Sequence, residues 1–276
     1  NPQTIHQRLL AHPEYQMRFA DRVQRHFFNE GALTPIATTE RFLIRANQID
    51  RAIIGESARF GDIVRGAENP PRTRDDDWLA AVDGVVDTLL PTRTAVVLEQ
   101  LKGQGWFPDV RAPRFLVNGV RQHGGTFAAN AALSLSNPNS GGTLYYTLDG
   151  SDPRLPAALD EGGMAAVNPS AQIYTDALTL SQNTWVRARV QEDGVWSALS
   201  EAVFVPDNLS DRVRITEIMF HPADAPVGHP DAEFIELKNI GTSPVNLYQL
   251  AFTDGIRFTF PDQTLQPGMS TVLVKD

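Results

Sequence analysis

The chain has 276 residues, enough for two or three domains, and its 42% hydrophobic and 21% charged residues are typical of folded globular proteins. The net charge is −9 and the acidic surplus is spread along the chain, which argues against a nucleic-acid partner. The chain has no cysteine, which excludes disulfides, thiolate catalysis and zinc–thiolate sites. No apolar run of about 18 residues occurs, so we expect no membrane-spanning segment. Because the sequence starts at Asn1 rather than Met and ends inside a strand-like run, we expect a segment of a longer polypeptide.

Residues 1–106 predict helices. Pro13 begins the first clear one, which carries an apolar residue every four positions, and Asn29–Gly31 ends it. Thr34 and Pro35 begin a second helix, as cap and first residue. Its apolar stripe consists of Phe42, Ala46, Ile49 and Ile53.

A third helix follows a loop at residues 65–74 that contains Gly66, Pro70 and Pro71. Asp75, Asp76 and Asp77 stand at its start, where acidic side chains interact well with the helix dipole. Pro91 is expected to break this helix, and a last one runs to Lys102 and Gly103. These segments predict a bundle of about four antiparallel helices.

The apolar spacing changes from helical to alternating after a linker at residues 106–113. Short strands with frequent turn residues predict a small β-sandwich over residues 113–206, interrupted by a long loop at 155–170. In residues 184–190 the alternation places Trp185, Arg187 and Arg189 on one face of a strand.

A polar linker at residues 207–211 leads to a second β domain at 212–276. Five strands are expected there, at residues 213–220, 233–239, 245–252, 256–260 and 270–276. Because a complete sandwich usually needs about seven strands, we expect this domain to be incomplete, with an unpaired strand at its edge.

Three stretches resemble known families. The run Tyr145–Pro153 (YYTLDGSDP), with Leu178–Leu180 and Thr184–Arg189, resembles the C-terminal β-sandwich of chitobiases and hexosaminidases, also called a fibronectin-type-III-associated module, over residues 113–205. The run Ile215–Met219, with Glu233–Asn239, Val245–Leu247 and Leu265–Gly268, resembles a lamin tail domain, an immunoglobulin-like fold whose later strands are missing here. Residues 10–62, including Glu56–Asp62, resemble the helical end of a spore-coat-H-type (CotH) kinase domain.

These resemblances imply a multidomain α+β protein, in which an N-terminal helical bundle (1–106) precedes two immunoglobulin-like antiparallel β-sandwiches (113–206 and 212–276), the last one incomplete. This order of modules is that of large exported bacterial proteins, so the resemblance places the protein outside the cell or in the cell envelope.

No catalytic constellation is visible in the sequence. A kinase needs a phosphate cradle, a lysine and metal-binding acids, whereas Gly124-Gly125 precedes no helix or lysine and is interpreted as a turn. If the parent protein phosphorylates a substrate, its active site lies upstream of Asn1. No serine stands in a nucleophile elbow either. We therefore expect no catalytic residue and no enzyme activity in this chain.

Asp149 and Asp152, with Ser151 between them, are the candidate metal ligands, because hard oxygens in a loop suit Ca²⁺. The same residues are also those of a tight turn, which is the alternative. Asp75–Asp77 is interpreted as a helix start, and a cation site is the alternative. We expect no other cofactor.

Carboxylates and histidines near the C-terminal end offer two further candidates. His221, His229, Asp231 and Glu233, with Glu217, form the one His–carboxylate cluster in the sequence, either as metal ligands or as solvated loop residues. Glu217 and Glu236 lie in neighbouring expected strands, where they are either a hydrolytic pair or cross-strand partners.

Aromatic residues of the central module are the candidate ligand-binding residues, because exposed rings can stack on sugars. Tyr145, Trp185 and Trp196 are selected, with Tyr146 and Tyr174 nearby, although strand alternation directs about half of them into the core. The expected function is accordingly that of a non-catalytic scaffold whose β modules dock to protein or glycan at the cell surface. The alternative is that the helices complete an ATP-using CotH-like kinase.

Overall fold

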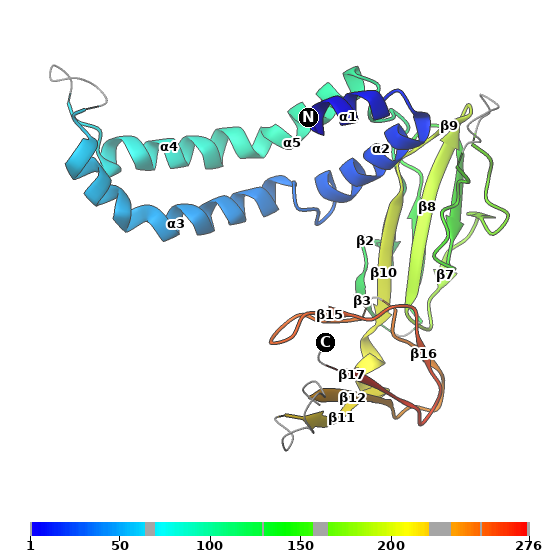
Figure 1. Ribbon diagram of the computed structural model, residues 1–276. Helices are drawn as coiled ribbons and strands as arrows, with labels where there is room; N and C mark the ends of the chain where they lie inside the picture. The colour runs from blue at the N-terminus through cyan, green and yellow to red at the C-terminus, as the bar shows by residue number, and fades with distance from the viewer. Residues whose placement is uncertain are drawn as a thin grey trace. The chain divides into compact units, whose positions relative to one another are not determined.

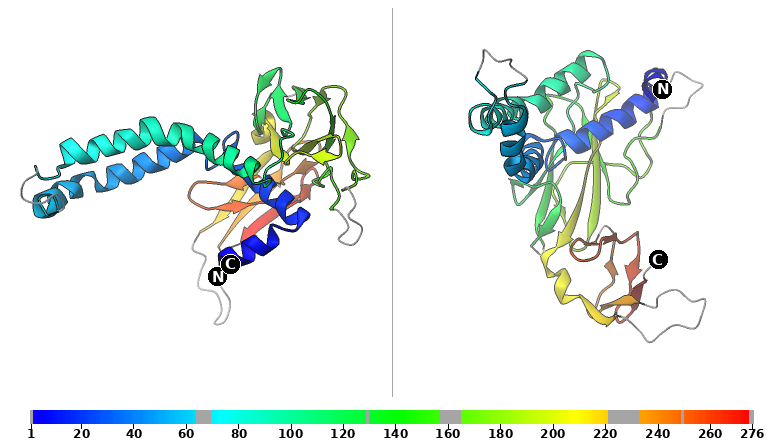
Figure 2. Two further views of the ribbon diagram at one scale, coloured as in Figure 1. Left: turned by 90° about the horizontal axis from the view of Figure 1, so that it is seen from above. Right: turned by 60° about the vertical axis from the view of Figure 1, so that its left-hand side comes forward.

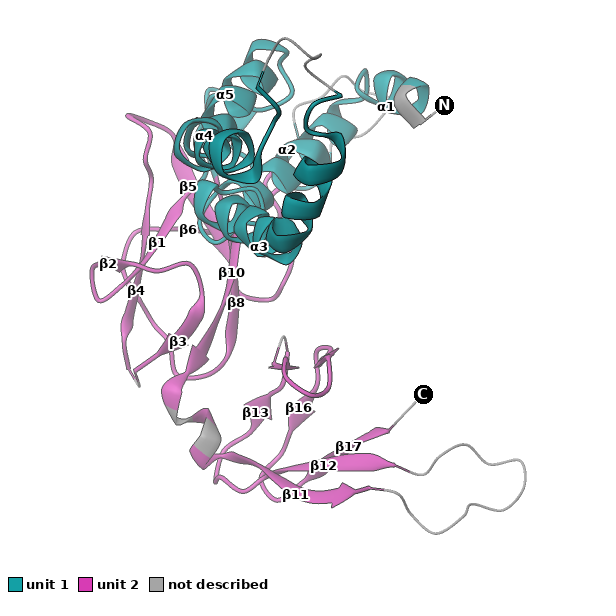
Figure 3. Ribbon diagram, turned by 90° about the vertical axis from the view of Figure 1, so that its left-hand side faces the viewer, with its two compact units in different colours: residues 1–112, 155–166, 190–200 teal, residues 113–154, 167–189, 201–276 magenta. Residues whose placement is uncertain are grey.

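A computed structural model describes residues 2–63, 70–128, 130–156, 165–220, 233–248 and 250–274. The chain divides into two compact units, residues 1–112 with 155–166 and 190–200, and residues 113–154 with 167–189 and 201–276 (Figure 3). Helices occupy the first part of the chain and mostly antiparallel sheets the rest, so the protein is of the α+β class with a β-sandwich (Figure 1). The sequence pattern predicted three domains, one helical and two β. The two expected β domains, 113–206 and 212–276, fall largely into the second unit.

The helical unit contains two long helical rods that lie side by side (Figures 1 and 2). One rod is α3, and the other is a run of four abutting segments that starts at η1. The helices are α1 (Pro2–Leu9), α2 (Pro13–Phe27), α3 (Pro35–Phe60), η1 (Arg74–Trp78), α4 (Leu79–Gly84), η2 (Val85–Leu89) and α5 (Leu90–Gly103). The expected starts at Pro13 and Pro35 and the end at Gly103 are confirmed.

The expected break at Pro91 is wrong, because the helix continues through this proline. Segments η1 and η2 are π-helical, and the N–H of Leu90 bonds to the carbonyl of Val85, five residues back. Proline has no N–H to give to an α-helical ladder and its ring crowds the preceding turn. The wider π turn just before Pro91 relieves that crowding, so the rod stays unbroken.

The core of the helical unit lies around α2. Ala20 and Val23 on its inner face are buried with Phe107 and Ala198, and Phe19, Phe27, Phe28, Leu98 and Leu101 pack against them. The backbone N–H of Leu199 also donates to the Asp21 carboxylate over 2.8 Å. Residues 106–113 were expected to be a linker, but Phe107 is a core residue and Trp106 contacts the rings of His6 and Phe19. The first part of this stretch therefore belongs to the helical unit.

The central β module is built from two sheets. One has the order β2-β1-β4-β7, and the other has the order β3-β10-β8-β5-β6 with β9 paired to β8. The strands are β1 (Arg114–Val117), β2 (Val120–Arg121), β3 (Gly125–Phe127), β4 (Ala132–Ser136), β5 (Thr143–Thr147), β6 (Gln172–Ile173), β7 (Leu178–Thr179), β8 (Thr184–Glu192), β9 (Val195–Trp196) and β10 (Ser200–Pro206).

Alternating residues of the two sheets meet in the core of this sandwich. Phe115 and Leu133 come from the first sheet, and Val186 and Phe204 from the second, all almost fully buried. Phe115 meets Phe204 edge to face at a centroid distance of 5.8 Å. The alternation predicted for β8 holds as far as Ala188, because Val186 and Ala188 are buried on one face while Trp185 and Arg187 are half-buried on the other. Arg189, expected on the same face as Trp185 and Arg187, is instead buried, because it pairs with Asp152.

The pairing of strand β3 departs from the antiparallel expectation. Strand β3 pairs parallel to β10, with Phe204 opposite Gly125 and Pro206 opposite Phe127. The two segments are far apart in sequence, and periodicity within one strand carries no information about a partner so distant. This pair joins the end of the sandwich to its beginning.

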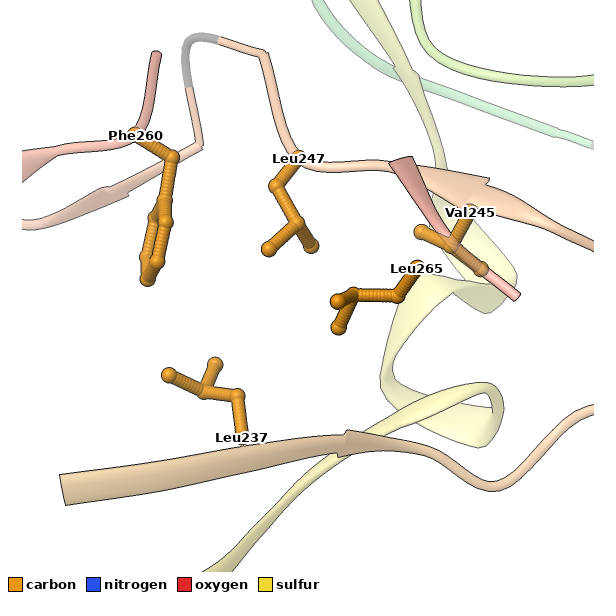
Figure 4. Packing of buried hydrophobic residues seen from close by; sticks show 5 residues of the cluster. All are labelled: Leu237, Val245, Leu247, Phe260 and Leu265. Atoms are coloured by element: carbon orange, nitrogen blue, oxygen red, sulfur yellow. The ribbon is translucent and has the colours of Figure 1, made fainter. Parts of the chain in front are cut away.

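The last β module contains three small sheets, with strand orders β11-β12-β17, β13-β16 and β14-β15. The strands are β11 (Val213–Met219), β12 (Phe234–Asn239), β13 (Val245–Asn246), β14 (Ala251–Phe252), β15 (Phe258–Thr259), β16 (Thr264–Leu265) and β17 (Ser270–Val274). The expected strand at 245–252 is split in two, β16 was not expected, and the expected linker is the 3₁₀ helix η3 (Asp207–Asp211). A single cluster of Leu237, Val245, Leu247, Phe260 and Leu265 forms the core (Figure 4).

Candidate functional site

The motif from Tyr145 to Pro153 forms a tight turn whose polar atoms are bonded within the chain. The carboxylate Oδ1 of Asp149 accepts from the backbone N–H of Ser151 at 2.9 Å and from its hydroxyl at 2.6 Å. The Thr147 hydroxyl donates to the Ser151 carbonyl at 2.5 Å. The hydrogen bonds from Ser151 hold the pKa of Asp149 below its ordinary value. Asp149 thus has the contacts of an Asx-type turn residue, the alternative to a calcium ligand.

Asp152 faces a buried arginine. Its two carboxylate oxygens accept from Nε of Arg189 at 2.7 Å and from Nη2 at 2.6 Å, and Oδ1 also accepts from the Arg154 N–H at 3.0 Å. The Arg189 side chain is only 1% exposed. Burial by itself raises the pKa of Asp152, but the hydrogen bonds and charge of Arg189 outweigh it and bring the pKa below its ordinary value. Both oxygens of this candidate metal ligand are therefore taken up by an ion pair.

No three His, Asp or Glu side chains within the described ranges lie close enough together to hold a metal ion. Asp149 and Asp152 are thus not joined by a third carboxylate or imidazole in this part of the chain, and the Ca²⁺ assignment stays a prediction. The Asp149–Asp152 segment stabilises the turn and connects it to strand β8. The Asp149 carboxylate accepts hydrogen bonds within the turn, and the Asp152 carboxylate accepts them from Arg189 on β8.

Trp185 lies between the two β modules of the second unit. Its ring packs on Tyr248 with centroids 4.9 Å apart, and the Arg187 guanidinium lies 4.8 Å from the ring centroid. Next to it, the Asn183 amide donates to the Asn246 carbonyl at 2.7 Å. The ring of this candidate sugar-binding residue is therefore already engaged by side chains of both modules.

Gly150 is required at its position because its backbone is left-handed and approaches this ring. Its φ is +79°, and an added Cβ would lie 2.8 Å from two ring atoms of Trp185. We expect Gly150→Ala to lower the free energy of unfolding by about 2–4 kcal/mol, measured by urea denaturation, because backbone strain and overlap add. Gly119→Ala is the matched control, since Gly119 has a φ of +81° in open space and should show the strain alone, about 1 kcal/mol. Equal losses in the two variants would contradict this account.

The other two candidate aromatics differ in exposure. Trp196 is 3% exposed and donates its indole N–H to the Ala165 carbonyl at 3.0 Å, so it lies in the core and offers no ring face to a ligand. Tyr145 on β5 is half-buried, opposite the exposed Ile173 on β6. Its neighbour Tyr146 is buried and donates its hydroxyl to Gln172. Strand alternation thus leaves both Tyr145 and Trp185 on half-buried faces, whereas Trp196 lies in the core.

The acidic run of the helical unit caps a helix. Thr73 donates its N–H to Asp77 and its hydroxyl to Asp76, each at 2.9 Å, and Asp75 pairs with Arg74. Arg74 in turn holds Asp50 of α3 through two hydrogen bonds of 2.9 Å. These contacts fit the helix-start interpretation of Asp75–Asp77 and tie the two rods together.

The remaining carboxylate candidates lie on β11 and β12. Glu217 and Glu236 are direct cross-strand partners, and Glu236 accepts a short hydrogen bond from Thr216. Glu217 is exposed on its strand, and its neighbours Thr216 and Ile218 on β11 are exposed too. His221, His229 and Asp231 lie outside the described residues, so their cluster with Glu233 stays a prediction.

His123 is a half-buried titratable residue that the sequence did not single out. Its ring stacks on Phe115 with centroids 5.4 Å apart. Burial lowers its pKa from 6.5 to about 4, although a hydrogen bond with the Glu201 main chain opposes the shift. The signal in the sequence is weak, because a lone histidine after a strand looks like a turn residue.

The low pKa of His123 predicts a pH-dependent stability. Below pH 6.5 the unfolded chain takes up a proton at His123 that the folded chain refuses down to about pH 4. Stability should therefore fall as the pH drops from 6.5 to 4, by about 3 kcal/mol at most from this residue. His123→Phe should flatten that slope in urea denaturation across the same pH range, whereas His26→Gln in the helical unit should keep it. An unchanged slope in His123→Phe would refute the assignment.

Comparison with known families agrees with the central module. Residues 122–201 match the model of the chitobiase/beta-hexosaminidase C-terminal domain. This match supports the β-sandwich resemblance seen in the sequence and covers the Tyr145–Pro153 turn with its partner strand β8. No curated protein matches the chain. None of the described helices is both long and apolar enough to cross a lipid bilayer.

Proposed function

We propose that the chain is a non-catalytic scaffold segment of a larger exported bacterial protein, whose β modules dock to protein or glycan at the cell surface. The observation that carries this proposal is that the polar and aromatic residues of the central module bond to other parts of the same chain. Asp149, Asp152 and Arg189 hold the turn to β8, and Trp185 holds one module to the next, so the polar and aromatic groups build a spacer. The matched C-terminal domain is a carbohydrate-associated β-sandwich, which is compatible with binding or scaffolding.

The finer description of the modules belongs to the same proposal. The last module has the strand arrangement of a partial sandwich and fits the lamin-tail resemblance in an immunoglobulin-like fold. Localisation outside the cell or in the envelope rests on the resemblance to exported proteins. The chain lacks the cysteines that would bear on its redox compartment.

A glycan version of docking would depend on Tyr145, because Trp196 is buried and Trp185 is packed between modules. We expect a glycan array to show binding that Tyr145→Ala weakens by about tenfold, through the loss of one stacked ring. Val120→Ala, an exposed change on the other sheet, is the control and should bind normally. Binding that survives Tyr145→Ala, or an empty array, would exclude the sugar version and leave protein docking.

A kinase-completing role of the helices is the second candidate. It is favoured by three isoleucines of α3 that stay more than half exposed, Ile36, Ile44 and Ile54, since helices with such residues often cover another domain. Titration calorimetry with Mg-ATP separates the two functions. The scaffold proposal expects no heat of binding, because Gly124 and Gly125 lead into strand β3 rather than into the helix that a phosphate-binding loop precedes. Saturable binding would favour the kinase role.

A further inference from the structure

We propose that the central module bears tension along the chain, and that the parallel pair of β3 with β10 is the clamp that resists it. The inference rests on the scaffold function proposed above, because a segment that spaces or docks other parts carries load between its ends. Strand β3 lies near the start of the module, and β10 ends it. The clamp consists of Gly125–Phe127 paired in parallel with Phe204–Pro206.

The direction of this pairing decides how a pull acts on it. A pull on the preceding chain draws β3 from its first residue, and a pull on the following chain draws β10 from its last. Because the two strands are parallel, they would have to slide past each other lengthwise, and their register pairs are strained together. An antiparallel pair loaded in the same way would open from one end, one hydrogen bond after another.

Buried side chains on both strands oppose the sliding. Phe127 at the end of β3 is 3% exposed, and Phe204 on β10 is fully buried against the ring of Phe115 on β1. Lengthwise movement of either strand would draw its ring out of the core and expose apolar surface to water. The clamp therefore resists tension through packing as well as through backbone hydrogen bonds.

The close approach of β3 to β10 depends on Gly124. Its φ is +86°, and an added Cβ would lie 2.8 Å from the carbonyl oxygen of Val203. Gln122 braces the same segment, because its side-chain amide donates to the carbonyls of Gly124 and Thr126, each at 2.8 Å. The chain that would transmit the pull into β3 is thus held against the start of the pair.

Tension from the helical core has two ways into the module. The core contains Phe107, upstream of β1, and Ala198, directly upstream of β10, and the neighbouring Leu199 N–H donates to Asp21 of α2. A pull that enters at Ala198 runs along β10 itself and leaves the clamp unloaded. A pull that enters at Phe107 reaches β3 through β1 and β2. The clamp therefore bears the load once the contact at Ala198 and Leu199 has released.

Single-molecule force spectroscopy of the 276-residue chain tests the clamp, and a sequence without cysteine lets two introduced cysteines set the direction of pull. Handles at Val120→Cys and Asp207→Cys load β3 from its start and β10 from its end, which is shear. Handles at Ala128→Cys and Asp207→Cys load the two strands from the same end, which peels them apart. All three positions are exposed. We expect the unfolding force at one loading rate to be about twofold higher in shear, because three register pairs share the load.

Gly124→Ala gives a second readout in the shear direction. Its Cβ overlaps the Val203 carbonyl, so it should lower the shear force toward the peeling value. Gly125→Ala is the matched control, because Gly125 has a φ of +82° and the nearest atom to its added Cβ is 3.9 Å away. It adds backbone strain without overlap and should keep most of the shear force.

Urea denaturation checks that the paired-cysteine variants are equally stable, so that a difference in force reflects the direction of pull. Equal unfolding forces in the two directions, or equal losses of force in Gly124→Ala and Gly125→Ala, would overturn the clamp. Either result would leave the scaffold function standing, since that function is tested separately by the glycan array and by calorimetry with Mg-ATP.

Discussion

Asp152→Ala should lower the free energy of unfolding by about 3–5 kcal/mol, since it leaves the Arg189 guanidinium buried without its counter-charge. The bidentate pair is partly screened only on the Asp152 side, whose side chain is 29% exposed, against 1% for Arg189. Urea denaturation at pH 7 measures the loss. Because the pKa of Asp152 is lowered, its contribution should be present above pH 3.8 and disappear as the pH falls through its folded value.

Two companion variants show whether the charge pair or the lost volume is responsible. Asp152→Asn keeps the shape and part of the hydrogen bonding to Arg189 but not the charge, and should lose less than Asp152→Ala. Asp152→Leu combined with Arg189→Met removes both charges, and should be more stable than Asp152→Ala alone, as is usual when a buried pair is replaced by apolar residues. A double variant as unstable as the sum of its single changes would refute an unpaired charge as the cause.

Leu247→Ala should cost about 2–5 kcal/mol and affect the last β module first. Leu247 is fully buried at the centre of the cluster with Leu237, Val245, Phe260 and Leu265 (Figure 4). The module has a small core, so a loss of this size removes much of what holds its sheets together. Hydrogen exchange should show faster exchange of β12 and β17 amides, while the amides of β5 stay protected.

Leu148→Ala provides the control for this experiment. Leu148 is 41% exposed, so its truncation should change the stability by less than about 0.5 kcal/mol. If Leu247→Ala speeds exchange equally in both β modules, the last module does not unfold as a separate cooperative unit.

The longer strands of the central module, β1, β4, β5, β8 and β10, were predictable because one face of each is buried. The alternation around Val186 and Ala188 on β8 and around Phe115 on β1 is a local property, and the observed strands follow it. The starts of α2 and α3 were predictable for a similar reason, since a proline at the first helical position acts within one turn.

Features that depend on distant partners were beyond the sequence pattern. Nothing near Trp185 indicates that its ring meets Tyr248, and nothing near Asp152 indicates that Arg189 takes both its oxygens. A carboxylate in a turn suits a cation and an arginine equally well, and only the fold decides between them. The π turn at Val85–Leu89 was not expected either. It lets the helix continue through Pro91, although proline usually ends or kinks a helix.

The last module was the hardest to predict, because several of its strands have only two residues. Two-residue strands such as β13 and β16 carry no readable period, so the expected 245–252 strand was drawn too long. Its core residues, by contrast, are ordinary apolar side chains, and Leu237, Val245 and Leu247 all fall inside stretches expected to be strands.

The parallel pairing of β3 with β10 determines when the central module can finish folding during translation. Strand β3 leaves the ribosome long before Phe204 and Pro206 of its partner strand have been made. Until then strand β3 has no β10 to pair with, and the sandwich of the nascent chain is incomplete. The module can therefore close only after its final strand has emerged, and a stall in translation upstream of residue 200 would leave the unfinished sheet exposed to aggregation.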